Sequence, residues 1–250
     1  MKDRSGFSEK TYRRNIVQPY LHHYRVQIQQ TDLWISTETD LSVEAREKTL
    51  ECRNELEAFL ADQPEFLHAL SPWSDDGPAP EIVRRMIHAG RFAGVGPMAA
   101  VAGAIAEAVG LRLKEMSQTV IVENGGDIFV VSPTPVVAAV FAGKSPLSMK
   151  IGVRIDHGHR PFGLCTSSGT VGHSLSFGHA DAVCVYATSC PLADAAATAI
   201  ANRVQTAEDI ASAIAFGRTI EGILGILIVV GRKIGAWGAM ELVPVVGKRC

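Results

Sequence analysis

The stretch LADAAATAIAN, residues 192–202, consists almost entirely of small apolar residues and predicts a helix that neighbouring segments approach closely. Two polar side chains interrupt it, Asp194 and Thr198. Residues four apart share one face of a helix, with their Cβ atoms about 5–6 Å apart. A carboxylate in such a place needs a partner, because burying an unpaired charge is costly.

Two interpretations of this pair are open from the residues alone. A carboxylate and a hydroxyl offer hard oxygen ligands, which suits Mg²⁺ shared with a phosphate. Alternatively, Asp194 lies in the first turn of its helix and interacts with the helix dipole. Thr198 would then bond back to a carbonyl of its own helix.

Composition narrows the class of protein. The 250 residues are 47% hydrophobic and 20% charged, which suits one large globular domain or two intimate subdomains. A net charge of −2 provides no basic footprint for nucleic acid. Five scattered cysteines, without zinc spacing or an apolar signal segment, predict reduced thiols and a cytoplasmic location. No apolar run approaches the roughly 20 residues that a membrane span requires.

Periodicity and turn signals predict an α+β fold with mostly antiparallel sheets packed with helices. We expect a flexible lead-in over residues 1–18 and a single domain of two intimate subdomains over 19–250. The expected helices are 42–61, 81–88, 97–116, 191–203 and 207–216. The expected strands are 20–29, 32–37, 119–122, 128–131, 136–141, 149–155, 162–168, 182–188, 222–230 and 233–242.

The segment ENGGD, residues 123–127, joins two β-branched runs and predicts a hairpin turn. Its functional interpretation is a cradle, since Gly125 and Gly126 let backbone N–H groups approach a phosphate or flavin edge. Asn124 and Asp127 would hydrogen-bond that group. A plain turn is the alternative.

A second polar segment contains Thr166, Ser167, Ser168 and Gly169, whose hydroxyls can donate to phosphate oxygens. An ordinary polar loop would have the same composition. The chain continues through His173, Ser174, His179 and Asp181, which also permits a serine hydrolase. The hydrolase is not favoured, because triads are usually assembled from distant segments. We expect His173 and His179 to position a ligand or to cap a strand.

A third candidate is the glycine-rich segment 93–96, which precedes the long apolar helix. Its exposed backbone could give a metal a carbonyl, from Ala93, or give a phosphate its amides. An interhelical turn explains the same glycines.

The order of these motifs resembles the ApbE-like superfamily of flavin transferases. That family has an Asn-x-Gly-Gly-Asp turn, a Thr-Ser-Gly loop and a helix reading Ala-Asp-Ala-x-Ala-Thr-Ala. Their counterparts are residues 124–127, 166–169 and 193–199, and the resemblance covers about 90–245. The chain looks most similar to an ApbE-related branch distinct from the flavin transferases proper.

The resemblance implies a duplicated, T-fold-like architecture, and an enzyme that binds FAD and uses Mg²⁺ to transfer FMN to a threonine of a protein acceptor. Asp194, Thr198 and a carbonyl near Ala93 would then be metal ligands, and Asp194 and Thr198 would also be the catalytic residues. The cofactors expected are Mg²⁺ and FAD or FMN. A homodimer is compatible with the sequence, which does not require one.

The sequence departs from the family pattern where the nucleotide binds. Pro97 replaces the family's lysine in the glycine-rich segment, and the segments 172–174 and 178–181 replace its His-x-x-Asp-Pro-x-Thr-Gly motif. Two further functions are therefore weighed besides the transferase. One is a non-catalytic protein that binds a flavin or another phosphorylated small molecule. The other, ranked below it, is the serine hydrolase.

Overall fold

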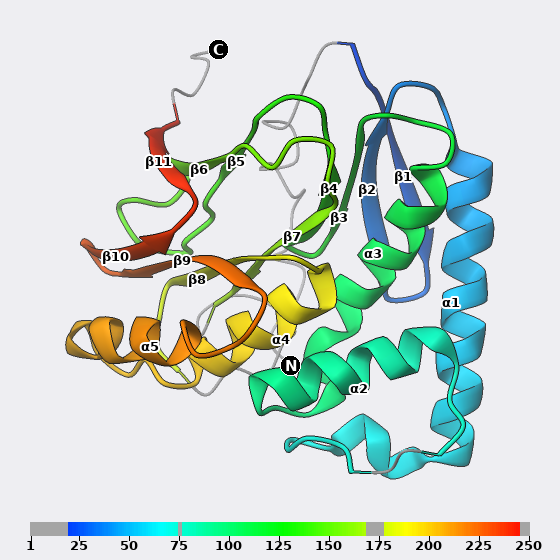
Figure 1. The fold of residues 1–250 in the computed structure, drawn as a ribbon, viewed down its shortest axis with the longest axis horizontal. Helices are drawn as coiled ribbons and strands as arrows, with labels where there is room; N and C mark the ends of the chain where they lie inside the picture. Colours follow the sequence, from blue (N-terminus) through cyan, green and yellow to red (C-terminus); the bar gives the residue numbers. More distant parts are fainter. Residues whose placement is uncertain (1–19, 75–76, 169–177, 246–250) are drawn as a thin grey trace, which may run out of the picture.

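The computed structural model describes residues 20–74, 77–168 and 178–245. The expected lead-in over residues 1–18 and part of the loop after residue 168 therefore lie outside the described residues. Within them, eight strands form one sheet in the order β1-β2-β3-β4-β7-β8-β9-β10, and all neighbouring strands are antiparallel. Figure 1 shows the helices gathered on one face of this sheet.

The strands of the large sheet are β1 (His22–Ile28), β2 (Thr31–Thr37), β3 (Val120–Asn124), β4 (Asp127–Val131), β7 (Phe162–Ser167), β8 (Ala182–Ala187), β9 (Ile223–Val230) and β10 (Lys233–Gly238). The α-helices are α1 (Ser42–Asp62), α2 (Glu81–Ala93), α3 (Val101–Leu113), α4 (Cys190–Ala201) and α5 (Ile210–Gly217). Short 3₁₀ helices are η2 (Pro64–His68), η3 (Pro97–Ala100) and η4 (Ala207–Asp209).

The two halves of the chain repeat one element order. β1 and β2 form a hairpin, α1 to α3 follow, and β3 and β4 form a second hairpin. β7 and β8, α4 and α5, and then β9 and β10 repeat this hairpin–helices–hairpin order. β4 pairs with β7, so the halves share one continuous sheet. The expected α+β class with antiparallel sheets is confirmed.

Successive side chains of a strand point to opposite faces of the sheet, so the large sheet has a hydrophobic core on each face. On the helical face, side chains such as Val122, Phe129 and Val185 pack against α3 and α4. On the opposite face, a smaller sheet in the order β11-β6-β5 covers the strands. It consists of β5 (Val136–Ala139), β6 (Ile151–Ile155) and β11 (Glu241–Pro244).

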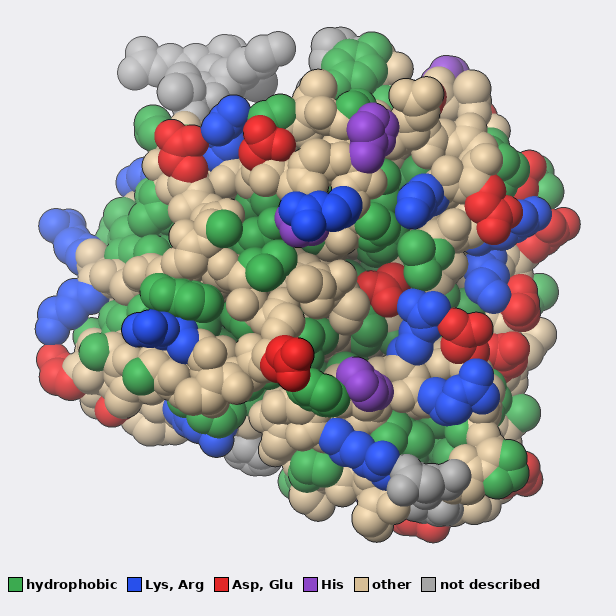
Figure 2. All heavy atoms as spheres, viewed as in Figure 1, with side chains coloured by type: hydrophobic (Ala, Val, Ile, Leu, Met, Phe, Trp, Pro, Cys, Tyr) green, Lys and Arg blue, Asp and Glu red, His purple; other side chains and the backbone are tan. Residues whose placement is uncertain are grey.

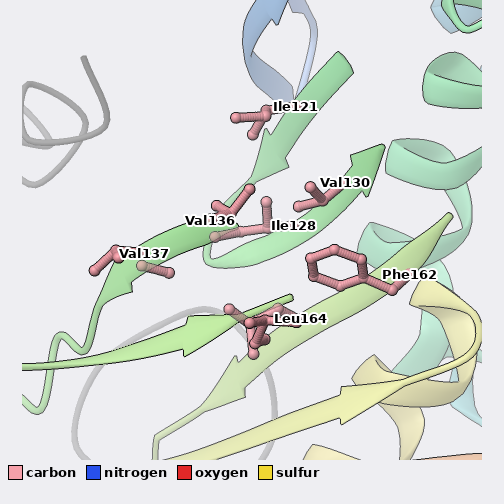
Figure 3. A pocket seen from close by; sticks show the side chains of 9 residues that line it. Ile121, Ile128, Val130, Val136, Val137, Phe162 and Leu164 are labelled. Carbon is pink, nitrogen blue, oxygen red and sulfur yellow. The ribbon is translucent and has the colours of Figure 1, made fainter. Parts of the chain in front are cut away.

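Apolar side chains fill the space between the two sheets. Val136 of the smaller sheet lies close to Ile128, Val130 and Leu164 of the larger one (Figure 3). The cavity that remains there is only about 10 Å³, too small for an organic ligand.

Several expected elements differ from the structure. The helix expected at 81–88 continues to Ala93 as α2, and the helix expected at 207–216 begins as η4 and continues as α5. The run 233–242 was expected to be one strand, but it divides into β10 and β11, which belong to different sheets. The division is at Gly238, whose φ of +101° turns the chain away from β9. The expected helix 97–116 is also shorter, since residues 97–100 form a 3₁₀ turn and α3 begins at Val101.

No single helix among the described residues is long and apolar enough to cross a membrane. The stretches 81–93 and 97–113 meet that criterion only when taken together, as a pair bent by 104°.

Candidate functional site

The β3–β4 turn ends beside the first turn of α3. Asn124 and Asp127 are paired across the turn, with Gly125 and Gly126 between them. Both glycines have positive φ, 69° and 111°, which a two-residue hairpin turn of this kind requires. The side-chain amide of Asn124 donates a hydrogen bond to the Ala102 carbonyl at 3.1 Å, which attaches the turn to α3.

Asp127 lies on the helical face of the sheet, opposite Cys165 of β7. Its carboxyl group is buried, and this burial raises its pKa to about 7. The Cys165 thiol and the Thr166 backbone N–H lie beside it and lower that pKa, but the cost of desolvation is larger. Asp127 is therefore protonated in part near neutral pH.

Asp194 of α4 reaches the N-terminus of α3. Its Oδ2 accepts a hydrogen bond from the Gly103 backbone N–H at 2.9 Å, and the Ala102 N–H also lowers its pKa. Burial nevertheless raises the pKa of Asp194 well above its usual range, and the charge of Asp127 raises it further. Within the described residues, neither carboxylate forms an ion pair with a basic side chain.

Thr198 lies one turn beyond Asp194, and both residues are 7% exposed. Its hydroxyl makes no hydrogen bond that the described part of the chain provides, so the expected bond back to a carbonyl is absent. The alternative that placed Asp194 in the first turn of its own helix also does not apply. α4 begins at Cys190, and Asp194 instead interacts with the N-terminus of α3.

We call Asn124, Asp127, Asp194 and Thr198 the acidic cluster. β3, β4 and α4 provide these residues, and the sequence predicted all four. Ser167 of β7 alternates onto the same face of the sheet as Cys165, and its buried hydroxyl has no partner among the described residues.

Among the described residues, no hydrogen bond joins Ala93, His179 or Asp181 to this cluster. Ala93 is the buried last residue of α2, followed by Gly94 in the left-handed conformation.

His179 is exposed and its Nδ1 lies 2.6 Å from the Gln205 side-chain oxygen. Asp181 accepts a hydrogen bond from the Gly231 N–H, so no His179–Asp181 pair forms among the described side chains. Gly169, His173 and Ser174 lie outside the described residues. Ser168 follows β7 and is partly buried.

The sequence analysis missed Glu107. This α3 residue is 6% exposed, and its Oε2 accepts a hydrogen bond from the Cys190 N–H at the start of α4, at 2.7 Å. Asp194 of α4 binds the start of α3 in the same way, so each helix caps the other. The second oxygen of Glu107 lies 2.8 Å from an Arg85 nitrogen. A single carboxylate in an Ala-rich apolar run was the available signal, and it is the same signal that identified Asp194.

Two cysteines were also missed. The Sγ atoms of Cys165 and Cys190 lie 3.6 Å apart, and both residues are fully buried beside the acidic cluster. Burial raises the pKa of Cys190 to about 11, so this thiol stays protonated at neutral pH. We assign both cysteines a packing role.

The donor set suits a hard divalent cation better than a transition metal. Among the described residues, no three His, Cys, Asp or Glu side chains converge as a metal site. Mg²⁺ commonly takes only one or two carboxylates and completes its coordination with water and substrate phosphates. Two buried carboxylates with a hydroxyl one helical turn away fit that requirement.

The acidic cluster predicts how stability depends on pH. The pKa of Asp127 is 3.8 in an unfolded chain and about 7 in the folded one, so the folded state binds more protons between these values. The free energy of unfolding should therefore fall as pH rises from about 4 to about 7. Urea denaturation in EDTA at a series of pH values measures this. The slope should be smaller in Asp127→Asn, and an unchanged slope would contradict the assignment to Asp127.

Sequence comparisons match most of this chain to known proteins. A family model described as "AbpE bacteria" matches residues 14–236. A UPF0280 protein of Methanosarcina acetivorans is 38% identical over 235 residues, which cover 92% of this chain and 91% of the relative. A UPF0280 protein of Methanococcus aeolicus is 40% identical over 222 residues, which cover 86% and 90% of the two chains.

Solved structures share the fold at low identity. A variant of the flavin transferase ApbE from Vibrio cholerae has a TM-score of 0.55 at 12% identity, with 88% of this chain and 97% of that chain covered. The apo form of the flavinyl transferase ApbE from Pseudomonas stutzeri has a TM-score of 0.52 at 15% identity, with 87% and 94% covered. The element order, the sequence match and the fold together show that the chain belongs to the ApbE family.

Proposed function

We propose that the acidic cluster binds Mg²⁺ together with the phosphates of a flavin or another phosphorylated ligand. The observation that carries the proposal is the pair of buried carboxylates, Asp127 and Asp194, which no basic side chain of the described residues neutralises. Two such groups close together in a low dielectric require a proton or a cation. A divalent cation satisfies both and attracts an anionic ligand to the same place.

The residues of the chain would then have distinct roles. Asp194 and Thr198, with a backbone carbonyl at Ala93, would hold the ion. Asn124 and the Gly125–Gly126 backbone would bind the edge of the ligand. Mg²⁺ supplies neutralisation of the charge that develops on a pyrophosphate when it is cleaved.

The activity we infer is transfer of FMN from FAD to the hydroxyl of a threonine in a protein acceptor, with AMP as the leaving group, as the family suggests. One observation favours the alternative, a non-catalytic protein that binds the same class of ligand. Pro97 stands where the family pattern has a lysine, and it is a buried residue that begins η3. A proline has no amino group to offer a phosphate, so ligand binding could persist here without turnover.

Calorimetry with FAD, FMN and ADP, each in Mg²⁺ and in EDTA, tests the proposal. We expect FAD to bind only with Mg²⁺, and Thr198→Val to weaken that binding about tenfold, because one oxygen ligand is lost. Thr219→Val is the matched control, since the Thr219 hydroxyl, in the turn after α5, donates to the Phe216 carbonyl. Equal flavin binding in EDTA, or no binding of FAD, FMN or ADP in either condition, would refute the proposal.

A transfer assay on the purified protein distinguishes the transferase from the non-catalytic alternative. Incubation with FAD, Mg²⁺ and threonine-containing acceptor proteins, followed by mass spectrometry, should show FMN on the acceptor if the transferase is active. Mg²⁺-dependent FAD binding without any labelled acceptor would favour the non-catalytic alternative.

A further inference from the structure

A groove of about 740 Å³ lies beside the start of α4, outside the acidic cluster. One wall is the face of α2 that carries Arg84, His88 and Phe92. The other wall includes Pro191 and Leu192 of α4 and Glu221 of the turn before β9. The volume is within the range of about 300–1,000 Å³ that small-molecule sites occupy.

The charges of this groove are only partly paired. Arg85 lies within ion-pair distance of both Glu81 and Glu107, so its charge is compensated. Arg84 donates instead to the Ala79 carbonyl, and Glu221 on the other wall has no ion pair among the described residues. In this part of the chain, one cation and one anion therefore face the groove without a charged partner. Figure 2 shows basic, acidic and histidine side chains around hydrophobic ones over α2.

Aromatic surface lies in the same groove. The rings of His88 and Phe92 have centroids 4.5 Å apart and planes inclined by 31°. Phe92 is 44% exposed, although apolar groups of the opposite wall line the same groove. A ligand that covers the Phe92 ring removes apolar surface from water, which favours binding.

We propose that this groove binds a short zwitterionic peptide with an aromatic residue between its charged ends. The carboxylate end would pair with Arg84, the ammonium end with Glu221, and the ring would pack against Phe92. Such a ligand places one charge of each sign opposite Arg84 and Glu221, the two charged residues of the groove without an ion pair among the described residues. A nucleotide fits less well, because its phosphate would meet the carboxylates of Glu81, Glu107 and Glu221.

The tripeptide Gly-Phe-Gly tests this, with free ends, with an N-terminal acetyl group or with a C-terminal amide. Binding is measured in EDTA by chemical-shift titration of the full chain. Glu221→Gln should weaken binding of the free peptide about threefold and that of the acetylated peptide hardly at all. Arg84→Gln should weaken the free peptide similarly and spare the amidated one.

Matched controls lie outside the groove. Glu65→Gln, Arg46→Gln and Phe141→Ala should leave binding unchanged, while Phe92→Ala should weaken it about tenfold through lost apolar contact. No shift at millimolar peptide, or equal binding by Phe92→Ala and Phe141→Ala, would overturn the proposal. Tighter binding of a doubly blocked Lys-Phe-Asp peptide would also overturn it, because it would identify a protein loop as the ligand.

The proposal is independent of the proposed function. EDTA removes any divalent cation from the acidic cluster, and Asp194→Asn should leave peptide binding unchanged. Peptide binding that is lost in EDTA, or lost in Asp194→Asn, would overturn the assignment of a separate site.

Discussion

Asp194→Asn is expected to abolish Mg²⁺-dependent ligand binding while the protein stays folded. In the unsubstituted protein, Asp194 Oδ2 accepts a hydrogen bond from the Gly103 N–H at 2.9 Å. The side-chain oxygen of asparagine can accept the same bond, but it carries no charge with which to hold a cation. We expect affinity for FAD in Mg²⁺ to fall at least 100-fold, at the upper end of the effect of disturbing a metal site. Calorimetry measures the affinity and circular dichroism checks the fold.

The metal-free variant provides a second readout. Removing one of two buried, mutually repelling carboxylates should leave the free energy of unfolding at pH 8 unchanged or raised. Asp194→Ala should instead lower it by about 1–3 kcal/mol, because the Gly103 N–H is left without its acceptor. Asp156→Asn, at an exposed position, is the control. Normal Mg²⁺-dependent binding by Asp194→Asn would refute the role of this carboxylate.

Gly103→Ala is expected to lower the free energy of unfolding by about 3 kcal/mol, the upper part of the range for overpacking. A Cβ atom there would lie 2.5 Å from the Cys190 carbonyl oxygen and 2.9 Å from the Asp194 Cβ. Backbone and a short side chain cannot move aside, so α3 and α4 must separate. Both carboxylate caps, at Gly103 and at Cys190, would lengthen as a result. Urea denaturation measures the loss.

Substitution of a second glycine, Gly158, distinguishes the cost of steric overlap from the cost of backbone strain. Gly158 has a φ of +60°, and a Cβ atom added there would meet nothing within 4 Å, so Gly158→Ala should cost only about 1 kcal/mol. It should leave ligand binding intact, whereas Gly103→Ala should weaken it by displacing Asp194. Equal stability of the two variants would show that α3 and α4 tolerate separation.

Local signals predicted much of the element order. The hairpin around Gly125 and Gly126 followed from turn chemistry and β-branched flanks, and α4 followed from its Ala-rich composition. The boundary errors have longer-range causes. Only Ala239 and Met240 separate β10 from β11, and their division at Gly238 depends on which sheet each strand joins.

The residues of the site also fall into those that local sequence signals predicted and one that depends on long-range packing. Asn124, Asp127, Asp194 and Thr198 were predicted because polar residues in apolar or glycine-rich surroundings are conspicuous. Glu107 was passed over because a single acid in a helix usually faces solvent. Its importance comes from the close packing of α3 against α4, which no spacing within either helix encodes.

The bond between Asp194 and the Gly103 N–H has a consequence for comparing this chain with its relatives. A carboxylate that joins two helices contributes to stability, so it can be retained even after any catalytic activity is lost. Its presence in a relative is therefore a poor diagnostic of activity. The Thr198 hydroxyl holds nothing together within the described chain, so a relative that keeps a hydroxyl there is the better candidate for a working enzyme.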